Sequence, residues 1–292
     1  MKNTDIFSLR RFGKYFVSDL KTATANFGMS MLLIGLFSIV LYAIIASINL
    51  LSAAPWEGPD EDLRIFIFGV AGFVLFTSMP VKCYGKITER KYGSEWLLLP
   101  ASAYEKSLSM IILTAFAAPL TGAVLYLATD SIICALDPTC GNNLIHITGQ
   151  FTQSLINPEI MLREGELASF PALYKFIHSM MNPLLYIDDI IMVSLTFLLG
   201  AICFKTRKTG KTILAIAIAS TAVSMAAAPF ISGMASKFSV EFASFQSPET
   251  LDQMIKSSWM LNNAALIDTI NDTLINIALV AAIFFRIKTL KH

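Results

Sequence analysis

The sequence predicts an all-α membrane protein: a bundle of about six transmembrane helices, with an amphipathic helix at the N-terminus and both termini in the cytoplasm. Two observations lead to this fold class. Apolar residues gather in blocks of about 20, the length of helix that crosses ~30 Å of hydrocarbon. Only 15% of residues are charged, against about 25% in ordinary soluble domains, so the polar surface is too small for a water-soluble globule of this size.

Six stretches are expected to cross the membrane: residues 27–51, 63–83, 107–129, 185–204, 212–234 and 264–285. The first is longer than the apolar region of about 7–15 residues in a cleavable signal peptide, so we expect it to be retained. Residues 1–292 then form a single transmembrane domain, with the six-helix membrane bundle over 27–285 and a tail over 286–292.

Charge alternates between the two ends of these spans. Seventeen of the 22 Lys and Arg residues lie in four stretches, 1–26, 82–106, 205–211 and 286–292, whereas 16 of the 21 acidic residues lie on the opposite side. Lys and Arg near helix ends stay in the cytoplasm. The pattern therefore predicts a multi-pass protein of the inner (cytoplasmic) membrane. Its net charge of only +1 suggests no nucleic-acid partner.

The first 26 residues have the pattern of a helix with two unlike faces. The apolar face carries Leu9, Phe12, Phe16 and Leu20, and the polar face carries Arg10, Arg11, Lys14, Ser18 and Lys21. Such a helix suits the cytoplasmic headgroup layer, where its cations meet anionic lipid. The alternative is a basic segment that only fixes the topology.

Two outer connections are long, residues 130–184 and 235–263. The first contains Cys134 and Cys140, six residues apart. An oxidising compartment would permit a disulfide between them, and the alternative is two free thiols.

Acidic residues open two of the expected spans. Asp188 and Asp189 begin the fourth, where water reaches them, and Asp268 begins the sixth. Asp272 and Asn276 follow at intervals of one turn, so this stripe is expected to face protein or a water-filled cavity. Cavity lining and structural helix pairing both fit it.

Catalytic patterns are missing from the sequence. Its three histidines are scattered, and neither a zinc-protease nor a serine-hydrolase motif is present. Thr209-Gly210-Lys211-Thr212 ends like a phosphate-binding loop, but Lys205 stands where that motif needs its first glycine. We expect a chain that is not an enzyme, has no catalytic or metal site and binds no cofactor.

The cytoplasmic connection after the second span carries the sharpest local pattern. A charged stretch and Gly93 precede Trp96-Leu97-Leu98-Leu99-Pro100, and Ser102 then precedes Glu105. This order predicts two short helices with a break between them, and a capping box of Ser102 with Glu105 at the start of the third span. A solvated loop has no use for Trp96 and three leucines. The segment therefore either packs under the bundle or docks onto a soluble partner.

This connection resembles the corresponding segment in permease subunits of the type-2 class of ABC transporters. Their pattern of E-R-x-x-G-T, a pair of leucines, a proline and a Ser or Thr is matched by Glu89, Arg90, Gly93, Ser94, Leu97, Leu98, Pro100 and Ser102, with Ser94 in place of the usual Thr. The long outer connection 130–184 departs from the compact form usual in that family.

The resemblance implies a permease subunit, expected to be an exporter, that forms a homodimer or heterodimer with another permease. A separate ATPase subunit, which uses the ATP, would dock on segment 86–104 through Glu89, Arg90, Gly93, Trp96, Leu97, Leu98 and Pro100. Two other readings stay open. One is a non-transporting membrane scaffold or immunity-type protein, and the other is an intramembrane enzyme that uses Asp188, Asp189, Asp268 or Asp272.

Overall fold

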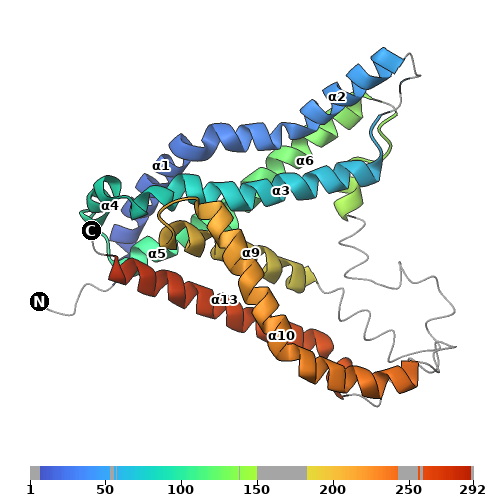
Figure 1. Cartoon of the computed structure of the whole chain (residues 1–292). Coiled ribbons are helices and arrows are strands. Elements are labelled where there is room, and N and C mark those ends of the chain that lie inside the picture. The colour runs from blue at the N-terminus through green and yellow to red at the C-terminus, as the bar shows by residue number, and fades with distance from the viewer. Residues whose placement is uncertain are drawn as a thin grey trace, which may run out of the picture. The chain divides into compact units, whose positions relative to one another are not determined.

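The computed structural model describes residues 7–52, 56, 58–137, 139–149, 183–242, 256 and 259–290. Throughout these residues the secondary structure is helical, without a strand (Figure 1). Five helical stretches are long and apolar enough to cross a membrane: Leu9–Ser52, Glu61–Thr88, Ala103–Leu136, Lys208–Ala226 and Leu266–Thr289. The all-α class is thereby confirmed, and the five stretches fit a multi-pass membrane protein by length and composition. The number of six spans and the cytoplasmic termini stay predictions.

The stretch expected as the fourth span corresponds to helix α9 (Pro183–Cys203), which has 21 residues and is not one of those five. By contact density the chain divides into two compact units. The first comprises Met1–Gln150, Ile190–Thr209 and Asn276–His292, and the second comprises Phe151–Asp189 and Gly210–Ile275. The outer connections 130–184 and 235–263 lie largely outside the described residues.

The N-terminal helix is longer than the sequence pattern predicts. Helix α1 runs without interruption over Leu9–Gly35, and the break before α2 (Phe37–Ser52) lies at Leu36 rather than at residue 26. Its buried residues include Tyr15, Ala23 and Phe27, whereas Leu9 of the expected apolar face is 78% exposed. α1 packs on α3, α5 and α6, and Phe16 of the expected apolar face packs against the core.

The third predicted span consists of three joined segments, α5 (Ala103–Ile111), the π-helix η2 (Ile112–Ala117) and α6 (Ala118–Leu136). The expected capping box is confirmed, because the Glu105 amide donates to the Ser102 hydroxyl and the Ser102 amide donates to the Glu105 carboxylate. Pro119 is the second residue after the π-helix. Since proline has no N–H to donate, the regular hydrogen-bond ladder is disturbed there.

The core of the first unit lies between α1, α3 (Glu61–Tyr84), the third predicted span and the parts of α9 and α13 (Ala264–Thr289) that belong to this unit. Its most deeply buried side chains include Met110, Leu198, Ile202 and Ile283, each with 0% exposure. Two glycines allow close helix contact. A Cβ added at Gly122 would lie 2.4 Å from Leu75 Cδ1, and one added at Gly35 would lie 2.6 Å from Leu125 Cβ.

The second unit contains α10 (Lys208–Phe242) from Gly210 onward, α12 (Trp259–Asn262) and the first part of α13. Every described side chain from residue 213 to residue 226 of α10 is exposed. Small residues of this part of the helix, such as Ala215, Ala217 and Ser220, are therefore exposed.

Candidate functional site

Segment 86–104, which the sequence predicts to be cytoplasmic, forms a compact corner between α3 and α5. A 3₁₀ turn, η1 (Gly85–Thr88), follows α3 and leads into α4 (Arg90–Leu97), and residues 98–102 link α4 to α5. The predicted pair of short helices corresponds to η1 and α4, which are separated at Glu89. Residues 98–102, between α4 and α5, contain no further helix.

Trp96 binds the segment to the rest of the first unit. Its Nε1–H donates to the hydroxyl of Tyr15 at 3.2 Å, and the Lys106 ammonium lies 4.5 Å from the centre of the indole ring. Lys106 also donates to the Trp96 carbonyl at 2.9 Å. Because Tyr15 and Lys106 are both buried, the partly buried Trp96 contributes to the packing of the bundle. For this residue the structure favours the first of the two sequence alternatives.

Other apolar residues of the segment face outward. Tyr92 is 46% exposed, Leu98 83% and Leu99 42%, and we call these three residues the exposed apolar face. The Lys86 ammonium lies 5.3 Å from the Tyr92 ring centre, which gives this face a basic edge. A face of this kind, next to a rigid support, is the usual form of a protein-binding anchor.

The remaining candidate docking residues are divided between surface and interior. Glu89 and Pro100 are exposed, whereas Gly93 is buried. The side chains of Arg90 and Leu97 lie outside the described part of the chain, so their predicted contacts stay predictions.

Buried polar contacts hold this corner in place. The carboxylate of Glu105 is fully buried and pairs with Arg11, whose Nε lies 2.8 Å from Oε2 and whose Nη2 lies 2.8 Å from Oε1. The Ser8 amide donates to the same carboxylate at 2.9 Å. On the other side, the Lys208 ammonium donates to the Gly85 carbonyl and, at 2.7 Å, to the Thr88 hydroxyl.

A half-buried acid joins three helices nearby. Asp19 of α1 accepts hydrogen bonds from the Tyr84 hydroxyl of α3 at 3.0 Å and from the Ser109 hydroxyl of α5 at 2.5 Å. In the sequence Asp19 counts only as one acid on the basic side. An acid surrounded by an otherwise cationic segment is the signal that could have identified it.

The acidic stripe of α13 lies partly inside the protein. Asp272 is buried (8% exposed), Asp268 is exposed and Asn276 is half-buried. Asp188 and Asp189 of α9 lie close enough to Asp272 to act on it electrostatically, so the second unit gathers four carboxylates in one region. Within the described residues no group of three or more His, Cys, Asp or Glu side chains is arranged to hold a metal ion.

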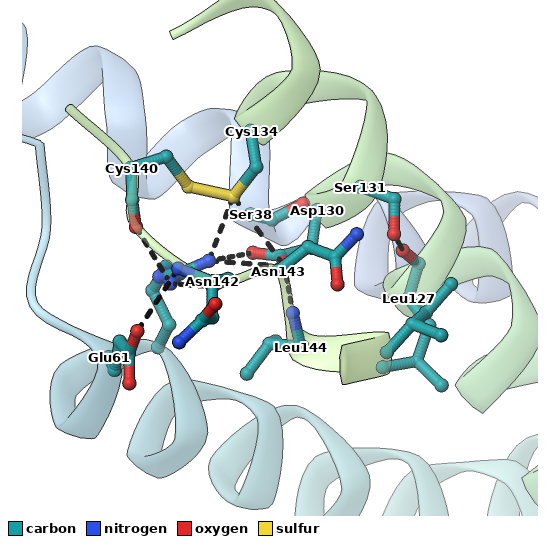
Figure 2. Close-up of polar contacts among 12 residues, drawn as sticks. Ser38, Glu61, Leu127, Asp130, Ser131, Cys134, Cys140, Asn142, Asn143 and Leu144 are labelled. Atoms are coloured by element: carbon teal, nitrogen blue, oxygen red, sulfur yellow. Dashed lines mark hydrogen bonds and ion pairs between the residues drawn. A yellow bond between two sulfur atoms is a disulfide. The ribbon is translucent and has the colours of Figure 1, made fainter. Parts of the chain in front are cut away.

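At the other end of α3 and α6, a buried ion pair lies beside a disulfide (Figure 2). Arg64 and Asp130 are each 1% exposed, and Arg64 Nη1 lies 3.2 Å from both carboxylate oxygens. Arg64 Nη2 also donates to the Cys140 carbonyl at 3.1 Å and to the Asn142 carbonyl at 2.5 Å. Asp130 accepts from the Leu144 amide at 2.8 Å, so both charges are compensated.

The disulfide joins Cys134 to Cys140, with Cα atoms 5.1 Å apart, and the Tyr42 hydroxyl donates to Cys140 Sγ at 2.8 Å. Partial burial opposes ionisation of Asp137, but hydrogen bonds from the Thr139 hydroxyl, the Thr139 amide and the Trp56 indole outweigh it and lower the pKa of this carboxyl. The loop is thus fixed by a covalent bond, an ion pair and a local cap.

Sequence reasoning missed the Arg64–Asp130 pair. Arg64 lies at the start of the expected span 63–83, and Asp130 directly follows the expected span 107–129. Ionisable residues at such positions usually pair with one another, and this rule is the signal that could have identified them.

Compared with known proteins, the chain matches no family model, no curated protein and no solved structure.

Proposed function

We propose that the chain is a permease subunit of an ABC transporter of the inner membrane, acting as an exporter and driven by a separate ATPase subunit. The ATPase, which uses the ATP, docks on segment 86–104, and the permease pairs with a second copy or with another permease. The pattern from Glu89 to Ser102 suggests this class. The single observation that carries the proposal is the exposed apolar face on a corner that buried polar bonds hold rigid.

Energetics support docking at this face. Tyr92, Leu98 and Leu99 expose apolar area, and burial in a partner's pocket removes that area from water. A single well-buried anchor contributes about 2 kcal/mol or more to binding, roughly thirtyfold in affinity. A rigid support reduces the ordering cost of binding, because few side chains must lose freedom.

The test is purification of the chain from its native membranes in mild detergent, followed by mass spectrometry of the proteins that remain bound. We expect an ABC ATPase in the complex with the unmodified chain, and its loss with Leu98→Ser combined with Tyr92→Ala. Leu136→Ser is the matched control, because Leu136 is 81% exposed at the opposite end of α6. Absence of any ATPase from the unmodified complex would favour a non-transporting scaffold.

A further inference from the structure

An apolar groove of about 300 Å³ lies in the first unit between α1 and the third predicted span. Residues from three helices line it, among them Thr24, Gly28 and Leu32 of α1, Ala117 and Thr121 of the third predicted span, and Met79 of α3. The groove belongs neither to segment 86–104 nor to the outer ion pair. Its lining is almost entirely apolar, and it lies on helices long and apolar enough to cross the membrane.

Local sequence explains the groove. The π-helix η2 ends at Ala117, directly before Ala118, and both small side chains line the groove. On the facing helix, a Cβ added at Gly28 would meet no atom within 4 Å, so the space in front of this glycine is open. Seven residues further along α1, Gly35 contacts Leu125 tightly. Leu125 also lines the groove, so this tight contact lies beside it.

Cations of α1 precede Gly28 of the groove in the sequence. Arg10, Lys14 and Lys21 are exposed, and their spacing places them on the same helical face as Gly28. Lys21 precedes Gly28 by two turns, about 10 Å along the helix axis. Along one helix face, positive charges are therefore followed by an apolar groove. This order matches an anionic phospholipid, in which a negatively charged phosphate is followed by hydrocarbon chains.

We propose that this groove binds one acyl chain of an anionic phospholipid, whose phosphate contacts Lys21 and Lys14. A helix of a second copy fits less well, because a two-fold symmetric contact through this face would bring the same cations together. Polybasic segments at a membrane surface attract anionic lipid, and the groove adds a hydrocarbon site to that attraction. The site does not depend on a transport function.

The test is native mass spectrometry of the purified full chain with phosphatidylglycerol or phosphatidylcholine of identical acyl chains. The unmodified protein is expected to retain phosphatidylglycerol in preference to phosphatidylcholine. Gly28→Leu adds a side chain at a groove position where an added Cβ meets no atom within 4 Å, and it is expected to reduce retention of phosphatidylglycerol at least tenfold. Lys21→Gln is expected to lower the preference for phosphatidylglycerol about fivefold, the effect of one cation at the membrane surface.

Gly69→Leu is the matched control, since Gly69 is an exposed helical glycine of α3 with equally open space in front of it and lies outside the groove. It is expected to leave lipid retention unchanged. Retention by Gly28→Leu equal to that of the unmodified protein would overturn the proposal, as would equal binding of the two lipids. A shift from dimer to monomer in Gly28→Leu with unchanged lipid binding would instead identify the groove as a contact between copies. If the Gly28→Leu protein is not produced in sufficient amount, Lys21→Gln still tests the contact between the lipid phosphate and α1.

Discussion

Replacing Trp96 separates a structural role from a docking role within segment 86–104. In Trp96→Ala the chain loses the indole packing, the hydrogen bond to Tyr15 and the contact with the Lys106 ammonium. Complete burial of Trp is worth about 3–5 kcal/mol relative to Ala, and Trp96 is partly buried, so packing accounts for roughly 2 kcal/mol. The hydrogen bond adds about 1 kcal/mol, and the cation–π contact adds a comparable amount.

The expected loss is therefore about 3–4 kcal/mol, since neighbouring contributions do not add fully. For a chain of this size, that loss lowers Tm by roughly 6–16 °C. The assay is thermal unfolding of the isolated chain in detergent, monitored by circular dichroism at 222 nm. Trp96→Phe keeps a ring but loses the donor to Tyr15, so its Tm is expected to fall by only about 2–4 °C.

Trp96→Ala and Leu98→Ser are then compared for bound ATPase and for Tm. Trp96→Ala is expected to retain the ATPase per folded molecule, whereas Leu98→Ser is expected to lose the ATPase at an unchanged Tm. An unchanged Tm in Trp96→Ala together with loss of the ATPase would refute the reasoning, because Trp96 would then be a docking anchor and not a packing residue.

Three further predictions concern the outer ion pair, the cysteines and the topology. Asp130→Asn leaves Arg64 buried without its counter-charge and is expected to cost about 3–5 kcal/mol in thermal unfolding, whereas Asp62→Asn, an exposed acid of the same region, changes Tm little. In protein prepared without reductant and then denatured, thiol labelling is expected to modify Cys83 and Cys203 but not Cys134 or Cys140, and four labelled cysteines would contradict the disulfide. In intact cells an impermeant thiol reagent is expected to label Gly149→Cys but not Thr289→Cys, and the reverse result would invert the predicted topology.

Features with a strong local or periodic signal could be predicted from the sequence. Blocks of apolar residues predicted the helices, because length and hydropathy are properties of one contiguous stretch. The capping box of Ser102 with Glu105 was predictable for the same reason, since its two partners are three residues apart.

Features that depend on distant partners could not be predicted. The sequence left two alternatives open for Trp96, because Tyr15, the hydrogen-bond partner of its indole, lies 81 residues away. The Arg64–Asp130 pair spans 66 residues, and hydropathy assigns each residue only to a span end. The buried residues Tyr15, Ala23 and Phe27 of α1 could not be predicted from its own periodicity, because the helices that pack on α1 select them.

The unbroken helix α1 connects the corner formed by segment 86–104 with more distant parts of the first unit. Its 27 residues span about 40 Å from Leu9 to Gly35, with no interruption before Leu36. Three side chains near its start bind the corner. Arg11 pairs with Glu105, and Tyr15 accepts a hydrogen bond from Trp96. Asp19 accepts hydrogen bonds from Tyr84 and Ser109. A displacement of α4 must therefore either break these bonds or move α1 with it. Because α1 is one continuous helix, such a displacement is transmitted from Leu9 as far as Gly35.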